Sequence, residues 1–225
     1  MKGNLHPITR YLRLAIKSFR ELGYDVYEGP EVDNEWYNFD SLNFPPNHPS
    51  RDMQDTFWLT DGRLLRTHTS NCQVRYAKDR LLPVKAVFPG NVFRNESADA
   101  KHESIFVQLE GLFIDKDVKL GHLFWTLEQF FKNIYGDSIQ IRFRPSYFPF
   151  TEPSFEVDVK LNGKWFELLG CGMVHPNVIK NMGLDPDKFS GFAIGLGVDR
   201  LVMLKYGIED IRNLRSGDLR FLKQF

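Results

Sequence analysis

Apolar residues near the N-terminus recur every three or four positions, which is the spacing of one face of an α-helix. The apolar face over residues 5–22 consists of Leu5, Ile8, Leu12, Ala15, Ile16, Phe19 and Leu22. Pro7 lies near the first turn and Gly23 follows the last apolar position, as is typical of helix ends. The pattern predicts an amphipathic helix over residues 5–22, and the same spacing predicts further helices over residues 118–135 and 201–206.

Between these helices, apolar residues occur in short extended runs separated by polar turns. Residues 84–94 and 104–114 flank the polar stretch 95–103, which predicts two antiparallel strands joined by a long loop. Asp61-Gly62 predicts a hairpin turn between residues 56–59 and 64–68, and Asn162-Gly163 predicts another. The remaining predicted strands cover residues 139–144, 154–161, 164–169 and 191–197.

These elements together indicate an α+β fold in one domain. Strands joined by hairpins and flanked by helices favour a mostly antiparallel sheet. A chain of 225 residues, 42% of them hydrophobic, can bury one substantial core. The sequence contains no internal repeat, low-complexity tract or linker. We therefore predict a single domain over residues 1–225.

Composition changes this picture mainly by limiting the partners. Lys and Arg total 29, as do Asp and Glu, so the net charge is zero and attraction to a polyanion requires a local patch or a partner protein. Cys72 and Cys171 are far apart and belong to no Cys/His cluster, which favours buried thiols in a reducing cytoplasm over a zinc site. No segment approaches about 18 apolar residues, so we expect no membrane span and no membrane partner.

Three short segments, taken in order, resemble the three motifs of class II aminoacyl-tRNA synthetases. Residues 23–32 resemble motif 1, which builds the dimer interface in that class. Phe93-Arg94-Asn95-Glu96 resembles motif 2, and residues 195–200 resemble motif 3, with Asp199 where Glu is also common. Each pattern alone recurs by chance, but their order and strand-end positions make the set specific. The resemblance implies the class II catalytic core, a mostly antiparallel sheet flanked by helices.

Longer stretches are similar to the α subunit of bacterial phenylalanyl-tRNA synthetases. They cover residues 51–59 (RDMQDTFWL), 64–70 (LLRTHTS), 143–154 (FRPSYFPFTEPS), 168–178 (LLGCGMVHPNV) and 218–225 (DLRFLKQF). The resemblance implies the catalytic domain of such a subunit without its N-terminal coiled coil. It also implies that ATP and Mg²⁺ are used to activate phenylalanine as an adenylate, which is transferred to tRNA-Phe. Expected assemblies are a heterotetramer with a β subunit or a homodimer through motif 1.

The motif matches assign the phosphate-binding residues. Arg94 is expected to brace the α-phosphate and the substrate carboxylate, and Arg200 to contact the γ-phosphate and adenine. A guanidinium suits these roles because it is permanently charged and donates parallel hydrogen bonds. His102, in the loop after motif 2, is expected to assist the phosphates. Outside these motifs, a lone arginine would more simply form a surface ion pair.

The resemblance also assigns the adenine and metal contacts. Glu96 is expected to accept a hydrogen bond from the adenine amino group, and Phe106 to stack on the ring opposite Arg200. The alternative for Phe106 is core packing within its strand. Glu152 matches the magnesium ligand of the family, where the ion is shared with the β subunit, and hard oxygen donors suit Mg²⁺.

The amino-acid pocket is assigned in the same way. Phe148 and Phe150 are expected to contact a substrate phenyl ring with Thr151, while the small Ala193 leaves depth for it. Without the resemblance, the Phe-Pro-Phe run would be read as a buried turn. A zwitterion taken from water needs both acceptors and donors around it. The residues expected to hold the ammonium and carboxylate are His68, Ser70, Gln108 and Glu110.

Several positions depart from the pattern of the family. Gln54, Val107 and Ile194 are expected beside the pocket and leave the exact amino acid open. The other departures are Asn71, Asn91 and the pair Leu214-Arg215. Two alternative functions therefore remain open. One is a stand-alone paralogue that activates an aromatic amino acid for an acceptor other than tRNA, and the other is a non-catalytic regulator.

Overall fold

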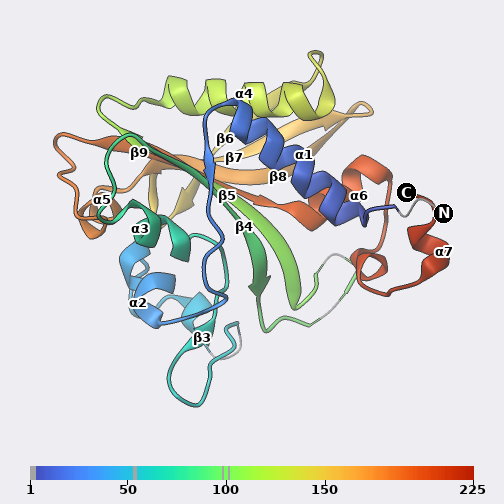
Figure 1. The fold of residues 1–225 in the computed structure, drawn as a ribbon, viewed down its shortest axis with the longest axis horizontal. Coiled ribbons are helices and arrows are strands. Elements are labelled where there is room, and N and C mark those ends of the chain that lie inside the picture. Colours follow the sequence, from blue (N-terminus) through green and yellow to red (C-terminus); the bar gives the residue numbers. More distant parts are fainter. Residues whose placement is uncertain (1–3, 53–54, 98, 101) are drawn as a thin grey trace.

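A computed structural model describes residues 4–52, 55–97, 99–100 and 102–225. Its centre is a seven-stranded sheet with the strand order β1-β4-β5-β9-β8-β7-β6 (Figure 1). All neighbouring strands are antiparallel except β1 and β4, which are parallel. The strands are β1 (Asp25–Val26), β4 (Val84–Phe93), β5 (Ile105–Asp115), β6 (Gln140–Phe148), β7 (Thr151–Leu161), β8 (Lys164–Val174) and β9 (Ser190–Gly197).

Helices and short elements cover the sheet in two groups. The helices α1 (Pro7–Glu21), α4 (Leu120–Tyr135) and α6 (Val198–Tyr206) pack over one hydrophobic cluster. The second group surrounds another cluster and lies at the lower left of Figure 1. It comprises β2 (Val32–Asp33), α2 (Glu35–Asn38), the 3₁₀ turns at Asp40–Leu42 and Pro49–Arg51, β3 (Leu64–Leu65), α3 (Asn71–Ala77) and α5 (Pro176–Asn181). The C-terminal part adds a 3₁₀ turn (Ile211–Leu214) and α7 (Leu219–Leu222).

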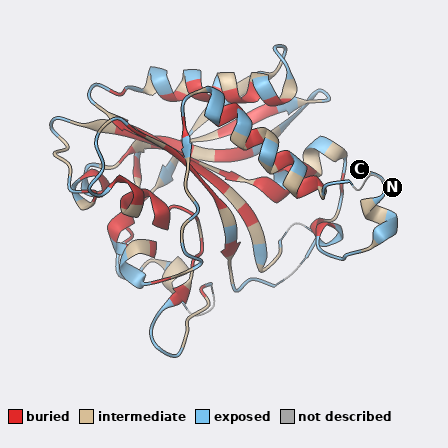
Figure 2. Ribbon diagram, in the orientation of Figure 1, coloured by how far each residue is buried: buried red, intermediate tan, exposed pale blue. Residues whose placement is uncertain are grey.

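Strand alternation divides the core between the two clusters. Because successive residues of a strand point to opposite faces, Ile194 joins the cluster beneath α1, α4 and α6, whereas Ala193 joins the other. Figure 2 shows buried and exposed bands along α1 and α4, as expected for helices with one face against the sheet. The amphipathic helix predicted over residues 5–22 thus forms and buries one face against the sheet.

The long predicted elements are confirmed with small shifts in their ends. The first helix covers Pro7–Glu21, and the last predicted one begins three residues early, at Val198. The turn at Asp61-Gly62 is present, since Leu59 N–H donates to Arg63 O at 2.8 Å. However, β3 pairs with β2. Its contacts with residues 56–59 are limited to an isolated bridge between Trp58 and Leu64 and the hydrogen bond from Leu65 N–H to Phe57 O at 2.9 Å.

Three predicted strands were too short, and two helices were missed. The strands predicted over residues 139–144 and 154–161 are β6 (Gln140–Phe148) and β7 (Thr151–Leu161). The strand predicted over residues 164–169 continues as β8 to Val174, through Gly170 and Gly172, which lower the strand propensity of the sequence. The helices α3 and α5 were missed because seven and six residues are too short to establish a helical period. No helix within the described residues has the length and apolar character that crossing a membrane requires.

Candidate active site

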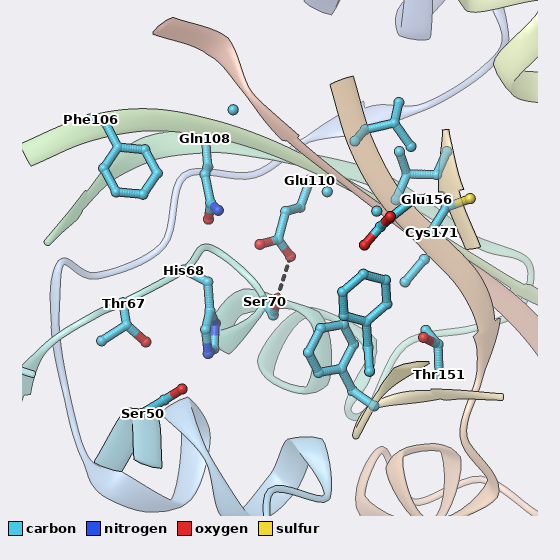
Figure 3. A pocket seen from close by; sticks show the side chains of 18 of the residues that line it. Ser50, Thr67, His68, Ser70, Phe106, Gln108, Glu110, Thr151, Glu156 and Cys171 are labelled. Carbon is cyan, nitrogen blue, oxygen red and sulfur yellow. Dashed lines mark hydrogen bonds between the residues drawn. The ribbon is translucent and has the colours of Figure 1, made fainter. Parts of the chain in front are cut away.

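A cavity of about 570 Å³ lies over strands β5, β9 and β8 (Figure 3). Glu110, Gly195, Gly170 and Glu156 are opposite one another across four strands and form one row of its floor. The two central glycines leave this floor without side chains, while carboxylates stand at either end. A cavity of this kind accepts a ligand close to the backbone of the sheet.

The aromatic end of the cavity brings together the residues predicted to contact a phenyl ring. The rings of Phe148 and Phe150 are stacked, with centroids 5.8 Å apart and an angle of 11° between their planes. Thr151 and Ala193 also line the cavity, as predicted. Phe44 completes this wall with its ring centroid 5.7 Å from that of Phe150. Sequence analysis missed Phe44, because it lies in the irregular Pro-rich connection where no period marks a buried position.

A buried polar group adjoins the aromatic wall. Glu110 Oε2 accepts hydrogen bonds from Ser70 Oγ at 2.5 Å and from Gln73 Nε2 at 3.0 Å. Burial raises the pKa of Glu110, and these hydrogen bonds partly oppose the rise. Gln108 Oε1 accepts from the Thr69 N–H at 3.1 Å. Gln73 was missed because it lies on the unpredicted helix α3.

His68 is partly buried beside Phe44, and both of its ring nitrogens are buried. Its ring is parallel to that of Phe44, at an angle of 6° and a centroid distance of 5.7 Å. Neither ring nitrogen has a hydrogen-bond partner among the described residues. Burial, with the nearby Arg94 charge, lowers the pKa of His68 to about 3, so the imidazole is neutral. Two unsatisfied nitrogens beside a cavity are suited to a polar ligand.

The two motif arginines line the same cavity, together with Glu96 and Phe106. Arg94 lies with its guanidinium carbon 4.9 Å from the Phe106 ring centroid, and its Nε donates to Thr67 O at 3.2 Å. Burial lowers the pKa of Arg94, but an arginine keeps its charge at neutral pH. The ring of Phe106 is therefore accessible from the cavity, and the cation in contact with it here is Arg94. Arg94 and Arg200, which are remote in sequence, thus line one cavity.

Two predicted site residues lie outside the cavity lining. His102 is exposed, and its Nδ1 lies 3.0 Å from an Asp99 carboxylate oxygen. Glu152 has a side chain that is 76% exposed, and its Oε2 lies 3.6 Å from His175 Nε2. The phosphate role of His102 and the metal role of Glu152 therefore stay predictions that rest on the resemblance.

Sequence analysis missed three cavity carboxylates, Asp55, Glu156 and Glu167, and the last two lie close together. Both contact the same Arg144 nitrogen, at 2.9 and 3.0 Å, and Arg144 also pairs with Asp158. Their carboxylates are hard oxygen donors, which suits Mg²⁺. No group of three or more His, Cys, Asp or Glu suited to a metal occurs in the described part of the chain. Such an ion would thus depend on substrate oxygens and water for its remaining ligands.

The departures from the family pattern lie mostly away from the cavity. Val107 and Ile194 pack in the cluster beneath the helices, although Ile194 also borders the cavity. Asn71 donates to Asp33, and Asn91 donates to Glu31. Gln54 lies outside the described residues.

Comparisons with known proteins agree with this geometry. Residues 1–225 match the family described as tRNA synthetases class II core domain (F). The chain is 52% identical over 224 residues to the phenylalanine–tRNA ligase alpha subunit of Proteus mirabilis (strain HI4320), covering 99% of this chain and 68% of that protein. The chain belongs to the phenylalanine–tRNA ligase alpha subunit family. The corresponding subunit of Yersinia enterocolitica serotype O:8 / biotype 1B is 53% identical over the same coverage.

The predicted α+β class II core is confirmed for this phenylalanine–tRNA ligase family member by the family match over residues 1–225 and by a solved structure. The pyrrolysyl-tRNA synthetase from Desulfitobacterium hafniense superimposes with a TM-score of 0.73, over 96% of this chain and 75% of that one. At 15% identity, this likeness establishes the fold alone. The reaction must therefore be inferred from the residues that line the cavity, and not from the fold.

Proposed function

We propose that this chain is the catalytic α subunit, or the core of one, that activates phenylalanine with ATP and transfers it to tRNA-Phe. The observation that carries the proposal is the continuity of the cavity. One space is lined by stacked phenylalanine rings, a buried carboxylate and two arginines. A substrate spanning it would have an apolar ring, an ammonium group and a polyphosphate in that order, as phenylalanine and ATP do when aligned for reaction.

The aromatic end selects the amino acid. Phe44, Phe148 and Phe150 surround a space of low polarity, and the single methyl group of Ala193 leaves it deep. Aromatic rings contribute about 0.5–1.5 kcal/mol per well-oriented pair beyond the area they bury. Glu110 supplies a carboxylate for the substrate ammonium, and neutral His68 adds a polar contact without repelling that cation. An apolar wall for the side chain, with the carboxylate placed only at the ammonium, favours an amino acid with an uncharged aromatic side chain.

The opposite end of the cavity binds and aligns the phosphates of ATP. Activation joins the amino-acid carboxylate to the α-phosphorus and releases pyrophosphate, so the protein contributes mainly alignment and charge stabilisation. Arg94 lies between the polar group and Phe106 and can hold both the attacking carboxylate and the α-phosphate. Arg200 then stabilises the charge of the departing pyrophosphate. Both guanidiniums act as fixed cations and exchange no proton with the substrate.

Mg²⁺ fits the cavity through the oxygen donors of its carboxylates. Glu156 and Glu167 would hold the ion, and Glu152 remains the ligand predicted from the resemblance. When bound, Mg²⁺ neutralises phosphate charge as pyrophosphate departs. A β subunit and tRNA-Phe are the proposed partners, because the chain itself carries no net positive charge to attract a nucleic acid.

The decisive experiment is phenylalanine-dependent exchange of pyrophosphate into ATP, with and without a β subunit from a relative. We expect exchange with phenylalanine and none with leucine or lysine. Charging of tRNA-Phe in the presence of the β subunit tests the transfer step. Exchange without any charging under both conditions would support a stand-alone paralogue, and the absence of exchange in both would exclude the proposed function.

A further inference from the structure

Asp199 links two parts of the fold that meet at the nucleotide end of the cavity. It lies in the first turn of α6, directly before Arg200, and only 2% of it is exposed. Its Oδ2 accepts a hydrogen bond from the Val107 N–H at 2.6 Å. Its Oδ1 lies 2.7 Å from the Arg215 guanidinium, in the C-terminal segment. One buried carboxylate therefore contacts strand β5 and the C-terminal segment at the same time.

The contact with Val107 continues the sheet beyond the end of a strand. Strand β9 pairs with β5 only as far as Gly197 opposite Gln108, because the chain then turns into α6. The Asp199 carboxylate thus takes the N–H of the next β5 residue. Val107 lies between Phe106 and Gln108, which both line the cavity. Asp199 consequently fixes the spacing between these two side chains and Arg200.

Arg215 provides the positive charge that this buried carboxylate needs. Burial raises the pKa of Asp199, and the charge of Arg215 acts in the opposite direction. Breaking a buried pair by removing one partner is strongly unfavourable, because the other charge remains buried without compensation. Without Arg215, Asp199 would gain by moving toward water or by taking up a proton. Either change would disturb the first turn of α6 that carries Arg200.

The segment that carries Arg215 also contacts the motif 2 loop. Ile211 N–H donates to Ala100 O at 3.0 Å, which joins the 3₁₀ turn to the loop between β4 and β5. His6 Nε2 lies 2.9 Å from Leu214 O, so the start of α1 holds the same turn from its other side. The turn over residues 211–215 is therefore attached to motif 2 through its backbone and to motif 3 through Arg215.

We propose that Arg215 is a positioning residue for ATP, acting through Asp199 to align Arg200 and Phe106. It touches no atom of the cavity itself and is absent from its lining. This inference rests on the proposed function, because it concerns the nucleotide end of the same site. It predicts an effect on ATP that is separate from any effect on the amino acid, whose pocket lies at the other end of the cavity.

The test compares Arg215→Gln with Arg212→Gln. Arg212 is the matched control, since it lies in the same turn but pairs with Asp210 on the surface. In pyrophosphate exchange, Arg215→Gln should raise the KM for ATP about tenfold and leave the KM for phenylalanine within about twofold. Arg212→Gln should change neither constant, and Arg215→Lys should recover part of the ATP affinity.

A double variant separates a loss of stability from a loss of ATP binding. Asp199→Asn combined with Arg215→Gln removes both charges and keeps an oxygen that can accept from Val107 N–H. If Arg215→Gln alone does not fold, this double variant should fold and still bind ATP more weakly, as measured by calorimetry. Equal KM changes for both substrates, or ATP binding unchanged in these variants, would overturn the inference. A wild-type protein that shows no exchange would instead count against the proposed function.

Discussion

The ring of Phe148 lies against the backbone of Gly170, on the strand beside its own hairpin. A Cβ atom on residue 170 would come within 2.8 Å of Phe148 Cζ. The absence of a side chain at Gly170 is therefore what lets the ring enter the cavity floor, and the aromatic wall depends on this glycine more than on the strand propensity of β8.

Gly170→Ala should accordingly displace Phe148 and weaken amino-acid binding. We expect the KM for phenylalanine to rise about tenfold, with the KM for ATP nearly unchanged. Gly111→Ala is the control, because a Cβ there would lie at ordinary contact distance, 3.7 Å, from Val87. Pyrophosphate exchange measures both constants. Equal KM values for phenylalanine in the two variants would show that the ring is not held by this contact.

Glu110 should make stability depend on pH. Burial raises its pKa above the ordinary value of 4.5, so the folded state holds this proton more tightly than the unfolded state. Its contribution to the free energy of unfolding is therefore fully present below about pH 4.5 and is lost as the pH rises through the folded-state pKa. Glu110→Gln removes this loss. Relative to wild type, the variant should gain stability as the pH rises above about 4.5 in urea titrations, and parallel curves would contradict the assignment.

Arg66 should be essential for stability, although its hydrogen bonds go mainly to backbone carbonyls and not to a carboxylate. Its buried guanidinium donates to Asn91 O at 2.7 Å and to Gly29 O at 3.0 Å. Arg66→Met leaves those carbonyls unsatisfied, which should cost about 3 kcal/mol of unfolding free energy. Arg63→Gln removes an exposed pair with Asp61 and should leave the free energy of unfolding nearly unchanged. A similar loss in both variants, measured by urea denaturation, would contradict this view.

The elements that sequence analysis predicted well are those whose periodicity is long enough to identify. Helix α4 has 16 residues and β4 has 10, so their patterns survive local irregularities. Phe44 was missed for the opposite reason, since its burial depends on a loop held by contacts such as the hydrogen bond from Arg51 to Phe44 O. No local pattern encodes such a contact.

Register was a second limit. Glu156 could be recognised as a cavity residue only by knowing that it stands opposite Gly170, and pairing between strands cannot be read from either strand alone. By contrast, Arg94 and Arg200 were predicted because their motifs fix both residue type and position at a strand end. The resemblance also suggested His102 and Glu152, whose roles depend on ligands or partners that one chain does not contain.

Removing single carboxylates should reveal which residues hold Mg²⁺. Glu156 and Glu167 lie in the cavity lining and share Arg144, whereas Glu152 is mostly exposed and near His175. If the cavity pair holds the ion, Glu167→Gln and Glu156→Gln should each raise the Mg²⁺ concentration for half-maximal exchange about tenfold. Both variants should remain folded, because Asp158 still pairs with Arg144.

Glu152→Gln serves as the matched control and as the competing assignment. In the isolated chain we expect it to leave the Mg²⁺ requirement unchanged, since its carboxylate does not reach the cavity. Binding of Mn²⁺ in the presence of ATP, followed by electron paramagnetic resonance, gives a readout that is independent of turnover. A larger loss of Mn²⁺ binding in Glu152→Gln than in Glu167→Gln would assign the ion to the exposed site at Glu152. It would then be the residue predicted from the resemblance, and not the cavity carboxylates, that carries the metal.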